Sequence, residues 1–216
     1  MYEESTDMAS RKRKSQTHKK RVNPVFRIYT EGEETEINYI KNYIKDFLEC
    51  KEYFKKNIVL QQPNDYSPYG LLTAAKKEKE TGDIAWLVFD CDAHPKKPQT
   101  FTEAADADIN IAYSSICFET WILLHFAYSA KPFSCCDEIK KELTHHFPNG
   151  YEKSLNNLFN LSVGDDMSRL STARKNATIL NSQTTLANAG KKIWEYNPYT
   201  DFYKLLDDIE KFIKEH

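Results

Sequence analysis

The stretch AWLVFDCD, residues 85–92, combines an apolar run with two carboxylates at its end. Aromatic and β-branched residues favour strands, so the stretch predicts a buried strand that ends in a polar turn. Side chains in a strand alternate between its faces, which places Asp90 and Asp92 on one face and Cys91 on the other. Two adjacent carboxylates repel each other and lose hydration, and a hard cation such as Mg²⁺ relieves both effects. The pair therefore predicts either a metal site or an ordinary exposed turn.

Further strands and helices alternate along the chain around this stretch. Strands are predicted at residues 25–29, 58–60 and 108–113, and amphipathic helices at residues 37–48 and 71–79. Helices between consecutive strands provide the crossovers that parallel strands need. The order therefore predicts an α/β fold with a mainly parallel sheet flanked by helices.

The second half of the chain is predicted to be mainly helical. We expect a loop at residues 93–102 and a buried helix at residues 118–126, which is apolar on nearly all sides. Residues 131–190 are predicted to be mostly helical, with breaks that include residues 148–150 and 163–164. A terminal amphipathic helix follows, and its predicted apolar stripe has five members: Phe202, Leu205, Leu206, Ile209 and Phe212.

Length and charge distribution predict one domain that follows a basic arm. The chain has 216 residues and a formal net charge of −2, and a domain usually contains about 100–200 residues. We expect residues 1–23 to be a disordered arm, since residues 11–21 contain seven basic side chains and no acidic one. The arm could bind phosphate backbones or remain solvated. A single domain is expected at residues 24–216, of which residues 131–216 form the mostly helical part.

The sequence predicts neither a signal peptide nor a membrane span, and the expected location is the cytoplasm. The chain contains five cysteines without CxxC spacing: Cys50, Cys91, Cys117, Cys135 and Cys136. Thiols stay reduced in the cytoplasm, so we expect five free cysteines, with neither a disulfide nor a zinc site. No Walker A loop, Rossmann glycine fingerprint, GxSxG or HExxH motif occurs, which argues against an NTPase, dehydrogenase, esterase or metalloprotease.

Acidic residues follow two of the predicted strands. Glu31 comes directly after the first strand and before the tight turn at Gly32, and Asp90 and Asp92 end the strand quoted above. Ligands of open α/β sheets bind at the carboxyl ends of the strands. The sequence therefore predicts that these three carboxylates meet at one edge of the sheet.

Four motifs carry a resemblance to a known family. They are TEGEETE at residues 30–36 with Tyr39 after it, VFDCD at residues 88–92, CFETWILLHF at residues 117–126 and the weaker NPYT at residues 197–200. A glutamate after the first strand and a later DxD motif resemble the Toprim domain of topoisomerases, primases and OLD-type nucleases. As an ordered set, the motifs resemble the RloB-like family of bacterial proteins encoded near restriction and phage-defence genes. The resemblance covers roughly residues 25–205.

Two positions depart from the pattern of that family. Asn-Pro commonly precedes the CFE block, where this chain has Ser115 and Ile116, and the turn after the first strand often carries lysine where this chain has Glu34. The acids that a Toprim site needs are all present, so the departures concern the fit of the substrate.

The resemblance implies a Toprim-like fold and Mg²⁺- or Mn²⁺-dependent cleavage of phosphodiesters by a nuclease that acts in phage defence. The implied catalytic residues are Glu31, Asp90, Asp92 and Glu119. Glu31, Asp90 and Asp92 would hold the metal, and Glu31 could instead act as general acid or base. Glu119 alternatively stabilises the dipole of the helix that it begins.

Four residues are predicted to contact the substrate. Gly32 precedes a helix N-terminus whose amides could bind a phosphate, and Lys153, Arg174 and Lys175 could neutralise its charge if the helical region folds over the acidic edge. For each basic residue, a solvated helix face is the simpler interpretation. His125 is predicted to be a hydrogen-bonded core residue.

Three functions remain open at this point. The first is a nuclease that acts on DNA or RNA. The second is a Toprim-like partner subunit that binds metal and works beside an ATPase encoded nearby, without activity of its own. The third is an enzyme that cleaves nucleotides or other small phosphoesters at the same metal.

Overall fold

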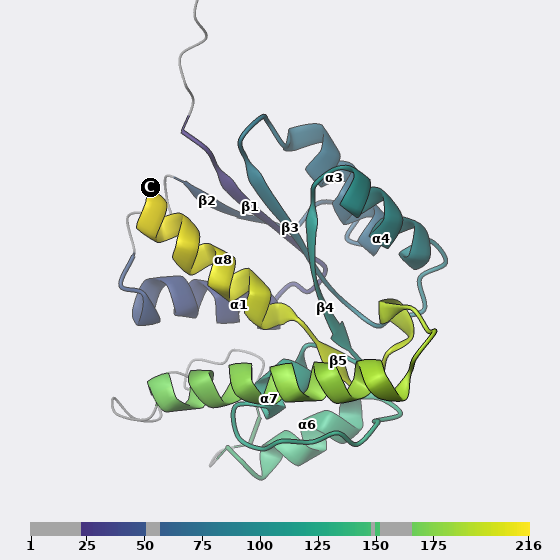
Figure 1. Ribbon diagram of the computed structural model, residues 1–216. Helices are drawn as coiled ribbons and strands as arrows, with labels where there is room; N and C mark the ends of the chain where they lie inside the picture. The colour runs from purple at the N-terminus through teal and green to yellow at the C-terminus, as the bar shows by residue number, and fades with distance from the viewer. Residues whose placement is uncertain (1–22, 51–56, 148–149, 152–165) are drawn as a thin grey trace, which may run out of the picture.

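The computed structural model describes residues 23–50, 57–147, 150–151 and 166–216, and Figure 1 shows their arrangement. A five-stranded sheet forms the centre, in the order β2-β1-β3-β4-β5. The first four strands in this order are parallel and β5 is antiparallel to β4. The strands are β1 (Phe26–Thr30), β2 (Ile58–Gln61), β3 (Ile84–Asp90), β4 (Asn110–Ser115) and β5 (Tyr199–Thr200). The predicted α/β fold with a mainly parallel sheet is confirmed.

Helices cover both faces of the sheet (Figure 1). One face packs against α3 (Pro68–Glu78), α4 (Lys97–Asp106) and the 3₁₀ turn η2 (Ile193–Glu195). The other face packs against α1 (Thr35–Asn42), the π-helical turn η1 (Tyr43–Phe47) and α8 (Phe202–Glu215). The same core continues past the carboxyl ends of the strands, where α5 (Glu119–Leu123), α6 (Cys136–Thr144) and α7 (Asp166–Ala187) lie. Both faces of β3 are therefore buried, which explains its continuous apolar run.

The alternation of side chains along β3 decides which way Asp90 points. Trp86 and Val88 belong to the core on the α1 and α8 face, while Leu87 and Phe89 belong to the core on the α3 and α4 face. Asp90 continues the first series, so its carboxylate points toward α1 and α5.

The terminal helix α8 closes the core on the α1 face, as its sequence pattern predicts. All five residues of the predicted stripe are buried: Phe202, Leu205, Leu206, Ile209 and Phe212. The Phe202 ring lies 4.8 Å from that of Phe118 and 5.4 Å from that of Tyr39. His125 is also buried there, and its ring nitrogens lie 3.0 Å from the Tyr39 hydroxyl and 3.0 Å from the Trp121 carbonyl oxygen. It is therefore the hydrogen-bonded core histidine that the sequence predicted.

The loop predicted at residues 93–102 is wrong in its second half, because α4 begins at Lys97. Pro98 lies in the first turn of this helix, where a missing amide hydrogen costs no intrahelical bond. Other boundaries shift less: β4 occupies residues 110–115, and the apolar helix α5 is limited to residues 119–123.

The expectation of five reduced cysteines is also wrong, because Cys117 and Cys136 form a disulfide. Cys117 lies between β4 and α5, and Cys136 is the first residue of α6. Their Cα atoms lie 5.9 Å apart although 19 positions separate them in the chain. Only the packing of α6 against α5 brings them together, so no local spacing motif marks the pair. Cys50, Cys91 and Cys135 are free.

The predicted basic arm at residues 1–23 lies outside the described residues, apart from residue 23, and so does the predicted break at residues 163–164. Within the described part of the chain, none of the helices has the length and apolar character that crossing a membrane requires.

Asp83 fixes the amino-terminal ends of β1 and β3 to each other. Its carboxylate accepts hydrogen bonds from the Val25 amide (2.9 Å), Arg27 Nε (2.7 Å) and the Glu80 amide (3.1 Å). Burial alone would raise the pKa of Asp83, but these donors outweigh it and hold the pKa below its usual value.

We expect Asp83→Asn to lower the free energy of unfolding by about 1–3 kcal/mol at neutral pH, because hydrogen bonds from a charged partner are weakened. The contribution of Asp83 is fully present above the unfolded pKa of about 4 and is lost as the pH falls through its lower folded pKa. Urea unfolding at neutral pH and below pH 4 measures this difference, with Asp106→Asn at the exposed end of α4 as control. An equally large effect of Asp83→Asn at both pH values would contradict a stabilising role of the ionised Asp83 carboxylate.

Candidate metal centre

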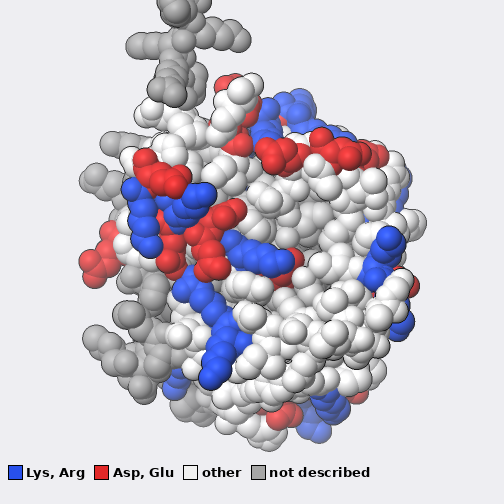
Figure 2. Space-filling view, viewed as in Figure 1, with Lys and Arg blue, Asp and Glu red and all other residues white. Residues whose placement is uncertain are grey.

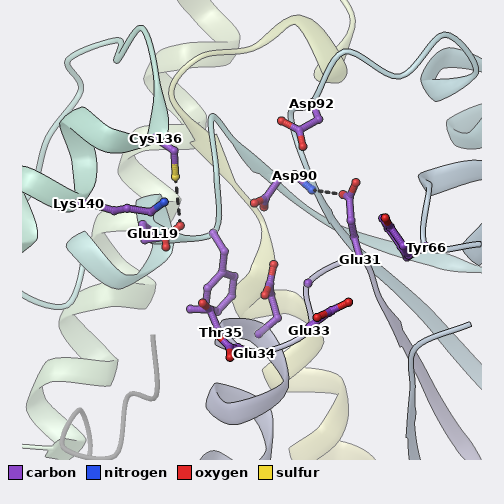
Figure 3. A pocket seen from close by; sticks show the side chains of 13 residues that line it. Glu31, Glu33, Glu34, Thr35, Tyr66, Asp90, Asp92, Glu119, Cys136 and Lys140 are labelled. Atoms are coloured by element: carbon purple, nitrogen blue, oxygen red, sulfur yellow. Dashed lines mark hydrogen bonds between the residues drawn. The ribbon is translucent and has the colours of Figure 1, made fainter. Parts of the chain in front are cut away.

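A cavity of about 410 Å³ opens at the carboxyl edge of the sheet (Figure 3). The segment after β1, the end of β3, the starts of α1, α5 and α6, and Tyr66 surround it. The lining residues are Glu31, Gly32, Glu33, Glu34, Thr35, Glu36, Tyr66, Asp90, Asp92, Phe118, Glu119, Cys136 and Lys140. Seven of these described residues carry a carboxylate and one carries an ammonium group.

Parallel pairing of β1 with β3 brings the predicted acids together. The Glu31 amide donates to the Val88 carbonyl oxygen (2.9 Å), which continues the ladder past the end of β1. The Asp90 amide donates in return to Glu31 Oε2 (3.2 Å). Glu31 and Asp90 are therefore neighbours at the carboxyl edge, as expected from the sequence.

Glu31, Asp92 and His94 form the first group of possible metal ligands. One ligand atom of each lies within 4.8 Å of the others. His94 Nε2 lies 2.8 Å from Glu31 Oε1, with the side chains 30% and 14% exposed. Burial raises the pKa of Glu31, against the opposing effects of the Asp90 amide and of His94.

Asp90 lies close enough to Glu36 and Glu119 for their charges to act on it, and Figure 3 shows it on the side of the cavity that faces Glu119. Burial and the negative charges of these two neighbours raise the pKa of Asp90 well above its usual value, and the Phe118 amide, which donates to its carboxylate, opposes the shift. Negative charges beside a buried carboxyl group disfavour its ionised form, and a bound cation would relieve that effect on Asp90.

The strand periodicity predicted that Asp90 and Asp92 share a face, but β3 ends at Asp90. Beyond this point the chain turns, and the Asp92 carbonyl oxygen accepts from the His94 amide (2.8 Å) and from Lys97 Nζ (3.0 Å). Asp92 therefore joins Glu31 and His94, whereas Asp90 faces Glu36 and Glu119. Asp90 therefore links the two sides of the cavity, because its amide contacts Glu31 and its carboxylate faces Glu36 and Glu119.

Gly32 makes room for one of these carboxylates. A Cβ atom at this position would lie 2.0 Å from Glu36 Oε2 and 2.5 Å from Glu36 Cδ. Any larger residue would therefore displace the Glu36 side chain, which is only 6% exposed. The structure assigns Gly32 a steric role in the position of Glu36.

Glu119 begins α5 and is also buried. Its Oε1 atom accepts from the Tyr151 hydroxyl (3.2 Å), and its Oε2 atom lies 3.3 Å from Cys136 Sγ. A sulfur in the disulfide carries no hydrogen, so the second contact is a hydrogen bond only when Cys136 is a thiol. Glu119 thus lies between the acidic cavity and the disulfide, and Figure 3 shows it beside Cys136.

The residues at this edge fit a hard divalent cation. Oxygen atoms from Glu31, Asp90 and Asp92 are the ligands that Mg²⁺ and Mn²⁺ prefer, and the nearby imidazole of His94 suits Mn²⁺ better than Mg²⁺. Burial raises the pKa of both Glu31 and Asp90, neighbouring carboxylates add to the shift at Asp90, and a bound cation would oppose both effects.

Arg174 and Lys175, two of the basic residues predicted to bind substrate, do not line this cavity. Arg174 pairs instead with Glu210 (2.6 Å) and Asp207 (3.1 Å), so it ties α7 to α8, and Lys175 beside it is exposed. Figure 2 shows acidic and basic side chains mixed over this α8 surface, as in an ordinary ion-paired helix face. Lys153 lies outside the described residues.

Sequence reasoning missed Glu36, Tyr66 and Lys140 as members of the site and left His94 out of the metal ligands. Glu36 belongs to the TEGEETE motif and His94 lies two positions after Asp92, so local spacing offered a signal for both. Tyr66 and Lys140 come from segments distant in the chain, and no local pattern links them to the acids.

One comparison with known proteins identifies the family of this chain. The family model described as "RloB-like protein" matches residues 26–209, a range that includes every residue of the cavity. No curated protein and no solved structure matches. Because the match covers most of the chain, including all five strands of the sheet, the chain belongs to the family of RloB-like proteins.

Proposed function

We propose that this protein is a divalent-metal-dependent nuclease that hydrolyses phosphodiester bonds at the acidic cavity. The observation that carries the proposal is the charge of one cavity at the carboxyl edge of the sheet, where the described lining residues include seven carboxylates and one ammonium group. A phosphodiester anion would be repelled from such a cavity unless cations first neutralised it. Bound divalent cations would make the same cavity attractive to a phosphate.

The ligands proposed for the cation are Glu31, Asp92 and His94, whose ligand atoms lie within 4.8 Å of one another, and Asp90 is a further carboxylate that lines the same cavity. A bound divalent ion would supply the positive charge that stabilises the charge developing on the phosphate oxygens. The chain itself supplies proton transfer. Glu31 lies 2.8 Å from the imidazole of His94, so this pair could transfer a proton if Glu31 does not bind the cation.

A nucleic acid is the substrate class that the rim of the cavity favours. Tyr66 lines the cavity and is 55% exposed, so its ring is accessible to a ligand. An exposed ring beside a phosphate site can stack on a nucleobase, which is how many proteins hold single strands. This contact favours a polynucleotide or nucleotide over a simple phosphoester. A role in phage defence, which the family resemblance implies, remains a prediction.

Asp90→Asn is expected to reduce Mn²⁺-dependent cleavage of a labelled oligonucleotide by more than about hundredfold. Mutation of residues that only hydrogen-bond to metal ligands already lowers activity about 10–100-fold, and Asp90 is proposed to act at the metal itself. The asparagine keeps the size of the side chain and an oxygen for the Phe118 amide. Asp106→Asn, on the exposed end of α4, serves as the matched control. Undiminished metal-dependent cleavage by Asp90→Asn would exclude this centre as the site of the reaction.

The same substitution is expected to stabilise the metal-free protein by about 0.5–2 kcal/mol at pH 8, as relief of strain in functional sites often does. The folded pKa of Asp90 is raised, so the wild type loses stability as the pH rises from the unfolded pKa to the folded pKa. Below about pH 4 the carboxyl group of Asp90 is protonated in both the folded and the unfolded state. The stabilities of the wild type and Asp90→Asn should therefore converge there. Melting temperatures across this range measure the effect, and a lower melting temperature of Asp90→Asn at pH 8 would contradict it.

Bound Mn²⁺ should make the wild type more stable than Asp90→Asn, the reverse of the order expected without metal. Mn²⁺ is expected to raise the melting temperature of the wild type, because a ligand that binds only the folded state stabilises it. The increase should be much smaller in Asp90→Asn and unchanged in Asp106→Asn. If Mn²⁺ raised the melting temperature equally in all three proteins, the ion would bind elsewhere. This test does not depend on a cleavage assay.

A further inference from the structure

Lys140 is the single cation among the described residues that line the acidic cavity. It is partly buried on α6, and Figure 3 shows its side chain extending beside Glu119 and Cys136. Seven carboxylates favour divalent cations in this cavity, whereas one ammonium group among them would weaken the binding of cations. Its presence therefore needs a reason other than the retention of metal.

The ion pair that the structure gives Lys140 does not hold it firmly. Its Nζ atom lies 3.7 Å from Oδ1 of Asp137, whose side chain is 90% exposed. This separation is too long for a good hydrogen bond, and exposed pairs of this kind contribute little stability. The ammonium group can exchange Asp137 for a stronger anion at low cost.

Two features fix the helix that carries Lys140. Ile139 and Leu143 are fully buried and anchor α6 in the core, and the disulfide joins the first residue of α6 to Cys117. Cys136 and Lys140 are four positions apart, so they lie on the same face of the helix. The bond at Cys136 therefore holds the face that presents Lys140 to the cavity.

We propose that Lys140 binds a phosphate group of the nucleic-acid substrate, in a position that the Cys117–Cys136 disulfide maintains. This inference rests on the proposed nuclease function and adds a substrate contact to it. Metal ions neutralise the carboxylates, and the lysine then supplies a compact positive charge for a phosphate oxygen on the α6 side of the cavity. Because the contact is ionic and partly exposed, it should weaken as the salt concentration rises.

Lys140→Ala tests the contact against Lys141→Ala, which removes the exposed neighbouring lysine from the same helix. The binding probe is a fluorescein-labelled single-stranded oligonucleotide in Ca²⁺, with fluorescence anisotropy as the readout. We expect Lys140→Ala to raise the Kd about tenfold and to flatten its salt dependence by about one phosphate contact. Lys140→Arg should retain most of the affinity, and Lys141→Ala should match the wild type.

In the cleavage assay with Mn²⁺, Lys140→Ala should raise KM while kcat changes little. A merely structural role would instead lower the melting temperature without rescue by arginine. If the affinity of Lys140→Ala equals that of Lys141→Ala, the assignment is wrong.

The role of the disulfide is tested with Cys136→Ser, and Cys135→Ser is the control because this adjacent cysteine is exposed and free. Cys136→Ser should raise the Kd as Lys140→Ala does, and the double variant should bind no more weakly than Lys140→Ala alone. Dithiothreitol should reproduce the effect in the wild type. Its two thiols are oxidised to a cyclic disulfide, while the protein gains two thiols. Additive effects in the double variant, or no effect of Cys136→Ser, would overturn the role of the disulfide.

The outcomes separate this inference from the nuclease proposal. If Asp90→Asn abolishes cleavage while Lys140→Ala leaves both Kd and KM unchanged, the metal centre stands and the lysine contact falls. If Lys140→Ala raises the Kd while Asp90→Asn retains full metal-dependent cleavage, the phosphate contact stands and the proposed centre falls.

Discussion

The parallel pairing of β1 with β3 is the constraint on which the acidic cavity depends. Register places Thr30 beside Val88, and the ladder continues through the hydrogen bond from the Glu31 amide to Val88. Two carboxylates separated by 59 positions in the chain thereby become neighbours, joined by the bond from the Asp90 amide to Glu31. A shift of this register by one residue would point Asp90 to the opposite face of the sheet.

The cost of this arrangement is visible in the electrostatics of the cavity. Burial and like charges raise the pKa of Asp90, and burial raises that of Glu31, so the fold holds these groups in an environment that disfavours their ionised forms. Structural acids elsewhere behave differently. Asp83 is also buried, but three donors hold its pKa below the usual value. The contrast supports the proposal of a ligand at the carboxyl edge, whereas Asp83 stabilises the amino-terminal edge through its hydrogen bonds.

The wall formed by α5 and α6 gives the cavity a chemistry that the sheet alone lacks. Glu119 links the Asp90 side of the cavity to Tyr151 and to Cys136, and Lys140 follows one turn later on α6. Since α6 and the sheet are far apart in the chain, the disulfide and the buried side of α6 determine how this wall meets the carboxylates. Among the described residues, the site therefore combines an acidic sheet edge with a disulfide-linked wall that contributes one lysine.

The sequence by itself determined the elements whose signals are local. Strand β3 and its acidic end, the glutamate after β1 and the apolar stripe of α8 were all predicted correctly, because side-chain periodicity in strands and helices depends only on near neighbours. The presence of Glu31 and Asp90 at one edge followed from the rule that parallel strands share a direction. The family motifs were recognised for the same reason, since each is a short, continuous run.

Tertiary structure alone decided which distant residues meet. The partnership of Cys117 with Cys136 and the position of Lys140 at the cavity depend on how α6 packs, which no spacing in the chain encodes. The same is true of Arg174, whose charge suggested a substrate contact but whose partners are Glu210 and Asp207 on α8. Charge and spacing identify what a residue can bind, and only the packing of the helices decides which partner lies within reach.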